Sequence, residues 1–173
     1  MNSLELLHSI TTFVFDVDGV LTDGTLLVMP GGVMIRRMNI KDGYALQLAV
    51  KKGYHVIVIS GANSPEVEDR LNKLGVKEVY MRVEDKLSLL QNYMQLHDVT
   101  VNQVLFMGDD IPDYIPMQLT GLPCCPADAA PEIKQISHYI SPIDGGKGCV
   151  RDVIEKVLKL NNHWDLDTTV ASR

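Results

Sequence analysis

Short apolar runs alternate with amphipathic stretches along most of this chain, and this alternation is the feature that most limits its fold. The runs are rich in Val, Ile, Leu and Phe and have the length of strands rather than helices. Continuous apolar runs of this kind are typical of parallel strands buried on both faces. The expected strands are 12–16, 55–60, 78–81, 104–107, 122–124 and 138–140. The pattern predicts an α/β fold, a Rossmann-like doubly wound parallel sheet.

The stretches between the runs carry helix boundary signals. Glycine follows the expected helices 42–52 and 64–74, and glycine is common just past a helix end. The second of these opens with Ser64 at the N-cap and Pro65 in the first turn. Further helices are expected at 85–97, 111–119, 130–136 and 149–160. Such crossover helices are the usual way to connect parallel strands.

One segment departs from the alternation directly after the first strand. Residues 26–40 form two short extended runs around Pro30-Gly31-Gly32, a turn signal that predicts a β-hairpin flap at about 25–40. A chain of 173 residues leaves no room for a second large domain, so we expect a single domain over 1–160. The remaining 161–173 are polar and without periodicity. They predict a tail, including Trp164, that is disordered or ordered only against a partner.

Composition narrows the classes of function. Hydrophobic residues make up 46% of the chain, and no apolar run approaches the roughly 20 residues of a membrane-spanning helix. Residues 1–10 lack the basic and apolar parts of a signal peptide, so we expect a soluble cytoplasmic protein. A net charge of −6 argues against nucleic-acid binding, which needs basic surface. Cys124, Cys125 and Cys149 have neither a disulfide nor a metal spacing and are expected to be buried thiols.

Polar side chains gather where the expected strands end. Asp16-Val17-Asp18 closes the first strand, Ser60-Gly61 the second and Gly108-Asp109-Asp110 the fourth, while Lys86 opens the helix after the third. In open parallel sheets, ligands bind at the carboxyl ends of the strands. The sequence therefore predicts that carboxylates, a hydroxyl and an ammonium group meet at one edge of the sheet.

These residue types suit phosphoryl transfer through a covalent intermediate. Asp16 can attack phosphorus as the nucleophile, and Asp18 can protonate the leaving oxygen and then activate water. Magnesium prefers a few oxygen ligands, which Asp16, Asp109 and a backbone carbonyl can supply. Each piece alone is more often structural, and only their combination at successive strand ends is specific. The groups that can hold the phosphoryl oxygens are Ser60, the amide of Gly61 and Lys86.

At these residues the chain resembles the haloacid dehalogenase (HAD) superfamily of phosphohydrolases. The four motifs of the superfamily match Asp16-Val17-Asp18-Gly19-Val20, Ser60-Gly61, Lys86 and 108–113. Extended matches at 18–24, 41–43 and 145–148 look like the branch that dephosphorylates 3-deoxy-D-manno-octulosonate 8-phosphate, in lipopolysaccharide precursor biosynthesis. The resemblance covers residue 12 to about residue 160, and it implies a phosphatase with a hairpin flap and no cap domain.

The resemblance also implies a role for each site residue. Asp16 would be the nucleophile, Asp18 the acid/base and a magnesium ligand through its backbone, and Asp109 a direct magnesium ligand. Asp110 and Asp113 would support these ligands from behind. Members of the branch are similar in forming homotetramers in which a neighbouring subunit completes each site. Residues implied to contact substrate are Thr22, Arg70 and Lys73.

The substrate has an alternative that the sequence leaves open. Close relatives of this branch act on nine-carbon sugar acids (KDN or N-acylneuraminate 9-phosphate) and often carry an acidic residue after the second motif. Many eight-carbon enzymes carry arginine there, whereas this chain has Ala62, which favours the eight-carbon substrate without matching its pattern. Arg70 and Lys73 can equally be solvated helix charges.

Two functions of another class are weighed against the phosphatase. A phospho-accepting signalling domain also uses an aspartate, magnesium and a lysine, but it places metal-binding acids at the end of the first strand and its acceptor in mid-chain. Here the candidate nucleophile closes the first strand. An idle oligomerising module of the same fold is the other alternative, and the joint presence of Asp16, Asp18, Lys86 and Asp109 argues against it.

Overall fold

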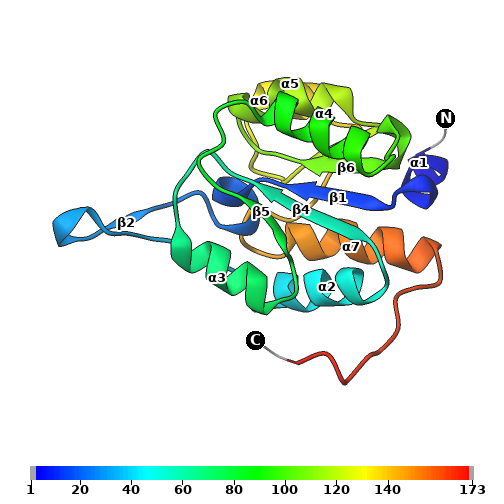
Figure 1. The fold of residues 1–173 in the computed structure, drawn as a ribbon, viewed down its shortest axis with the longest axis horizontal. Helices are drawn as coiled ribbons and strands as arrows, with labels where there is room; N and C mark the ends of the chain where they lie inside the picture. Colours follow the sequence, from blue (N-terminus) through cyan, green and yellow to red (C-terminus); the bar gives the residue numbers. More distant parts are fainter. Residues whose placement is uncertain (1–2, 172–173) are drawn as a thin grey trace.

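A six-stranded parallel sheet forms the centre of the molecule (Figure 1). The structure is a computed structural model that describes residues 3–171. The expected domain begins at residue 1 and the expected tail ends at residue 173, so residues 1–2 and 172–173 of these predictions lie outside the described residues. The strand order is β5-β4-β1-β6-β7-β8, and every neighbouring pair is parallel. The predicted doubly wound α/β fold is confirmed. The strands are β1 (Thr12–Phe15), β4 (His55–Ile59), β5 (Glu78–Tyr80), β6 (Val104–Met107), β7 (Leu122–Cys125) and β8 (Tyr139–Ile140).

Helices cover both faces of this sheet, as Figure 1 shows. One layer holds α2 (Ile40–Lys51), α3 (Pro65–Lys73) and α7 (Cys149–Leu160), and the other holds α4 (Lys86–Leu96), α5 (Tyr114–Leu119) and α6 (Pro131–Ile136). Short 3-10 turns occur at Pro30–Gly32, Val101–Gln103 and Ile111–Asp113. Of the helices within residues 3–171, none is both long and apolar enough to cross a bilayer.

The local helix signals hold with three differences. The sequence did not predict α1 (Ser3–Ser9), which packs against α7. The expected helix 111–119 is divided into the 3-10 turn Ile111–Asp113 and α5. Ser64 stands at the N-cap of α3, but its hydroxyl donates to Glu66 at 3.4 Å and caps no backbone amide.

Two apolar cores lie on opposite faces of the sheet because successive side chains of a strand point in opposite directions. On β1, Phe13 and Phe15 join the core beneath α2 and α7, whereas Val14 joins the core beneath α4, α5 and α6. Cys124, Cys125 and Cys149 are free thiols and buried, as expected. Because helices cover both faces of the sheet, the polar side chains that follow the strands can reach solvent only at the strand ends.

The expected flap is a two-stranded antiparallel hairpin, and Figure 1 shows it projecting from the body of the molecule. Its strands are β2 (Leu27–Val28) and β3 (Met34–Ile35), joined through Pro30–Gly32. Gly31 has φ +81°, a conformation that glycine adopts without strain. Apolar side chains of the hairpin face solvent, with Leu27 60% and Val28 66% exposed. Within residues 3–171 the hairpin is the insertion after β1, and no cap domain accompanies it.

The tail lies along α2 of its own chain, so the expectation of disorder or of order only against a partner was wrong for residues 161–171. The hydroxyl of Tyr44 donates to the carbonyl of Asp167 at 3.3 Å, and the Lys51 ammonium lies 2.5 Å from the Asp167 carboxylate. The Trp164 ring packs edge-on against Tyr44, with the Arg151 guanidinium 5.3 Å from its centroid. Opposite charges and aromatic contacts order the tail, and neither requires periodicity in its sequence.

Candidate active site

The loop that follows β1 turns back tightly and carries two of the expected catalytic residues. The amide of Asp16 donates to the carbonyl of Met107 at 3.1 Å, which fixes the end of β1 against β6. The hydroxyl of Thr22 accepts from the amides of Gly19 and Gly24, both at 3.2 Å. Thr22 is fully buried, so its side chain holds the loop together rather than facing the pocket that was expected to take substrate.

A buried lysine joins two carboxylates at the centre of the site. The Lys86 ammonium lies 2.8 Å from Oδ1 of Asp16 and 2.7 Å from Oδ1 of Asp113, and its residue is only 7% exposed. Lys86 is therefore not the solvated helix lysine that was the alternative. The amide of Asp109 donates to the other oxygen of Asp113 at 3.2 Å, so Asp113 connects α4 to the end of β6.

Burial and mutual repulsion make the carboxyls of this site hard to ionise. The pKa of Asp16 is raised to about 7 by burial and by Asp113, against the opposing effect of Lys86. The pKa of Asp109 is also raised to about 7, by burial and then by Asp16 and Asp113. Burial alone would lower the pKa of Lys86, but the two carboxylates raise it, so Lys86 stays charged. Added positive charge would stabilise this arrangement.

Three of these carboxylates can share one cation. One oxygen from each of Asp16, Asp109 and Asp113 lies within 4.8 Å of the others, and such hard oxygen donors suit magnesium. Gly19 makes room for Asp109, because a Cβ on Gly19 would stand 1.9 Å from Oδ2 of Asp109. Asp113 lies within the acidic cluster, where Lys86 and the amide of Asp109 already engage both of its oxygens. The carboxylate of Asp110 instead accepts from the amide of Ile111 at 2.8 Å.

The expected phosphate-binding residues face the same pocket, which has a volume of about 390 Å³. Ser60 is held at the end of β4 because its amide donates to the carbonyl of Tyr80 at 2.9 Å. Its hydroxyl oxygen accepts from the amide of Ala62 at 3.1 Å. The predicted catalytic, metal and phosphate residues that line this pocket are Asp16, Asp18, Ser60, Gly61, Lys86, Asp109, Asp110 and Asp113.

Comparisons with known proteins find relatives that match most of the chain. The 3-deoxy-D-manno-octulosonate 8-phosphate phosphatase KdsC of Yersinia pestis is 33% identical over 150 residues, which cover 87% of this chain and 80% of that protein. The chain belongs to the KdsC phosphatase family. No protein-family model matches the chain.

Solved structures place the KdsC family within a larger group. The 3-deoxy-D-manno-octulosonate 8-phosphate phosphatase of Moraxella catarrhalis, in complex with magnesium, phosphate and a KDO molecule, has a TM-score of 0.88 at 28% identity and covers 92% of each chain. A HAD superfamily (subfamily III A) hydrolase of Legionella pneumophila has a TM-score of 0.88 at 30% identity, covering 92% of this chain and 87% of that one. The predicted HAD superfamily membership is confirmed.

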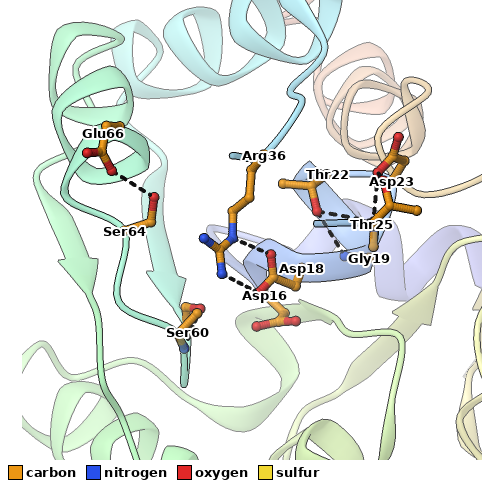
Figure 2. Close-up of polar contacts among 12 residues, drawn as sticks. Asp16, Asp18, Gly19, Thr22, Asp23, Thr25, Arg36, Ser60, Ser64 and Glu66 are labelled. Atoms are coloured by element: carbon orange, nitrogen blue, oxygen red, sulfur yellow. Dashed lines mark hydrogen bonds and ion pairs between the residues drawn. The ribbon is translucent and has the colours of Figure 1, made fainter. Parts of the chain in front are cut away.

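In this member of the KdsC family, sequence reasoning missed the side chain that holds the Asp18 carboxylate. Arg36, just after β3, donates through Nε to Oδ1 of Asp18 at 2.7 Å and through Nη2 to Oδ2 at 3.2 Å. Figure 2 shows Arg36 reaching from the hairpin to Asp18, with Asp16 and Ser60 beside the pair. The sequence offers only two adjacent arginines at the end of an apolar run, and nothing local says which one turns inward.

The two basic candidates on α3 lie outside this pocket. Arg70 lines a second hollow, between the hairpin and α3, together with Arg36 and Glu66. Lys73 lies 2.6 Å from Asp69 in an i, i+4 pair and lines a third hollow beside the tail. Neither side chain lines the pocket that holds Asp16 in the same subunit.

Proposed function

We propose that this chain is a magnesium-dependent phosphatase that hydrolyses 3-deoxy-D-manno-octulosonate 8-phosphate through an aspartyl-phosphate on Asp16. One observation carries the proposal. The ammonium of Lys86 bridges Asp16 and Asp113 at the carboxyl end of β1, in a pocket that also holds Ser60. The proposal includes a cytoplasmic location, a role in lipopolysaccharide precursor synthesis, and residues 1–160 as one phosphatase domain with a polar tail at 161–173.

The chemistry proceeds in two balanced steps. A carboxylate oxygen of Asp16 forms a bond to phosphorus while the bond from phosphorus to the sugar oxygen breaks, and Asp18 gives its proton to that oxygen. In the second step water attacks the acyl phosphate, Asp18 takes the proton of the water, and Asp16 leaves as a carboxylate. Lys86, Ser60 and the amide of Gly61 hold the phosphoryl oxygens, on which charge accumulates.

The donor set of the acidic cluster fits magnesium. Asp16, Asp109 and the backbone carbonyl of Asp18 would hold the ion, while Asp110 and Asp113 would orient them. The bound ion neutralises carboxylate and phosphate charge, so that the two anions can approach each other. The buried ammonium of Lys86 offsets part of the Asp16 charge from within the same pocket.

A homotetramer is the assembly that we propose for this chain. The exposed apolar side chains of the hairpin, Leu27 and Val28 among them, support it because burial against other subunits would remove them from water. In the proposed assembly Arg70 and Lys73 reach a neighbouring site, where a sugar carboxylate would be their ligand. Size-exclusion chromatography with light scattering tests the assembly, and a monomer at assay concentration would refute it.

Phosphate release is the direct test of the function. Purified enzyme should release phosphate from 3-deoxy-D-manno-octulosonate 8-phosphate only with magnesium, and Asp16→Asn should lower kcat by about 10³-fold or more because the nucleophile is lost. Asp98→Asn is the matched control, since Asp98 is exposed in the turn after α4. Equal turnover in excess chelator contradicts the mechanism. A higher kcat/KM on nine-carbon 9-phosphates contradicts the substrate.

A further inference from the structure

The carboxylate of Asp18 has one strong partner, and that partner comes from the hairpin. Arg36 holds both oxygens of Asp18 in a forked contact, at 2.7 Å and 3.2 Å. Among residues 3–171, the Asp18 carboxylate accepts hydrogen bonds from Arg36 alone. The Asp18 side chain is 38% exposed, whereas the Arg36 side chain is 6% exposed. The buried, planar guanidinium therefore fixes the orientation of a carboxylate that is otherwise free to rotate.

The backbone around Arg36 is tied to the catalytic loop. Met38, two residues later, forms an antiparallel bridge with Thr22, the residue whose hydroxyl closes the loop that carries Asp18. The backbone next to Arg36 is thus fixed to the loop that carries Asp18. Arg36 and Glu66 of α3 also line the same second hollow, and the charge of Glu66 favours the protonated guanidinium. Figure 2 shows Arg36 extending to Asp18, while Glu66 of α3 is paired with Ser64.

We infer that Arg36 is a positioning residue that aims Asp18 at the leaving oxygen. The inference rests on the proposed function, in which Asp18 gives a proton to that oxygen. The Nε–Oδ1 contact is the shorter one, so it keeps Asp18 in place while Oδ2 exchanges its weaker partner for the leaving group. Removing Arg36 would leave Asp16 and Lys86 intact and would impair the proton transfer.

Two substrates separate this role from a structural one. The leaving oxygen of a sugar phosphate departs as an alcohol and needs a proton, whereas p-nitrophenyl phosphate releases a stabilised phenolate that needs none. Arg36→Ala should lower kcat on the sugar phosphate by about tenfold or more, since proton transfer by a positioned side chain contributes roughly 10²–10⁴-fold. On p-nitrophenyl phosphate the rate of aspartyl-phosphate formation, followed as the pre-steady-state burst of p-nitrophenolate, should change by less than about threefold, because that step needs no proton from Asp18. Hydrolysis of the intermediate, in which Asp18 takes the proton of water, is common to both substrates, so the comparison is made on the first step, in single turnovers.

Arg37→Ala is the matched control, because Arg37 is the adjacent and exposed arginine of the same hairpin strand end. It should behave like the wild type on both substrates. The kcat of Arg36→Lys on the sugar phosphate should lie between those of the wild type and Arg36→Ala, since a single ammonium replaces the two-pronged guanidinium contact. Arg36→Lys also serves as the second variant if Arg36→Ala does not fold.

The outcomes are distinguishable from a failure of the proposed function. A wild-type enzyme that releases phosphate from neither substrate defeats the phosphatase proposal itself. An active wild type whose Arg36→Ala and Arg36→Lys variants lose equal factors in the rate of aspartyl-phosphate formation from both substrates overturns the positioning role and assigns Arg36 to the fold. Unchanged turnover of the sugar phosphate overturns it as well.

Discussion

The buried carboxyl of Asp42 makes the stability of this protein depend on pH in a way that can be calculated. Asp42 is 2% exposed and lies in the first turn of α2. Its Oδ1 accepts from the amide of Arg151 at 2.8 Å, in the first turn of α7, while its buried Oδ2 has no hydrogen-bond partner among the described residues. Burial raises its pKa to about 6, against the opposing effects of the Arg151 amide and charge.

The sign of the effect follows from the direction of the shift. An acid whose pKa is higher in the folded state binds its proton more tightly there, so ionisation costs stability as pH rises above the unfolded value of 3.8. The cost is fully present above the folded pKa. With pKa values of 3.8 and about 6, it amounts to about 1.6 kcal/mol at pH 5 and about 3 kcal/mol at pH 8.

Asp42→Asn removes this titration and keeps an oxygen for the Arg151 amide. Its new NH₂ group has no partner where Oδ2 lies, which costs about 1–3 kcal/mol at every pH. The diagnostic quantity is therefore the change with pH. Relative to wild type, the variant should gain about 1.4 kcal/mol of unfolding free energy between pH 5 and pH 8.

Urea unfolding followed by far-UV circular dichroism measures this gain, at one protein concentration because assembly also affects stability. Asp98→Asn is the control for removing an exposed carboxylate, and asparagine tolerates the positive φ of 52° at that position. The reasoning is refuted if the difference between Asp42→Asn and wild type is the same at both pH values, or if the variant loses stability as pH rises.

Two further predictions concern the catalytic loop and the tail. Gly19→Ala should lower kcat/KM by about tenfold or more. The new Cβ would stand 1.9 Å from Oδ2 of Asp109 and would displace that side chain, and the φ of +83° at residue 19 strains any residue other than glycine. Gly32→Ala, with φ +80° and open space around it, is the control in the same phosphate-release assay, and an equal loss there contradicts the Asp109 argument. Truncation after Leu160 should lower the free energy of unfolding by about 1–3 kcal/mol, because the Trp164 contacts and the lysine pairs of the tail are lost. Thermal unfolding measures this loss, and an unchanged Tm would show that the tail contributes nothing.

The sheet could be predicted from the sequence because its signal is local. Parallel strands that are buried on both faces, such as β1, β4 and β6, are near-continuous apolar runs, and here only Thr12 and His55, at the starts of β1 and β4, interrupt the pattern. The helix α7 was predicted with its observed bounds, since its apolar stripe continues over three turns. The seven residues of α1 are too few to show a period, and the polar tail owes its order to charges on α2 that lie more than a hundred positions earlier.

The position of Lys86 in the helix could be predicted from neighbouring residues, whereas the partners of its ammonium depend on distant parts of the chain. The carboxylate of Asp85 accepts from the amide of Ser88 at 2.9 Å, and this cap makes Lys86 the first residue of α4. This helix start is therefore set by residues close to Lys86 in the sequence. Whether the ammonium then meets water or carboxylates depends on the ends of β1 and β6, which bring Asp16 and Asp113 within 2.8 Å and 2.7 Å. The co-occurrence of motifs at strand ends predicted this meeting only because parallel strands direct their carboxyl ends to one edge. Arg36 reaches the same edge from an antiparallel hairpin, to which that rule does not apply, and so it could be found only in the structure.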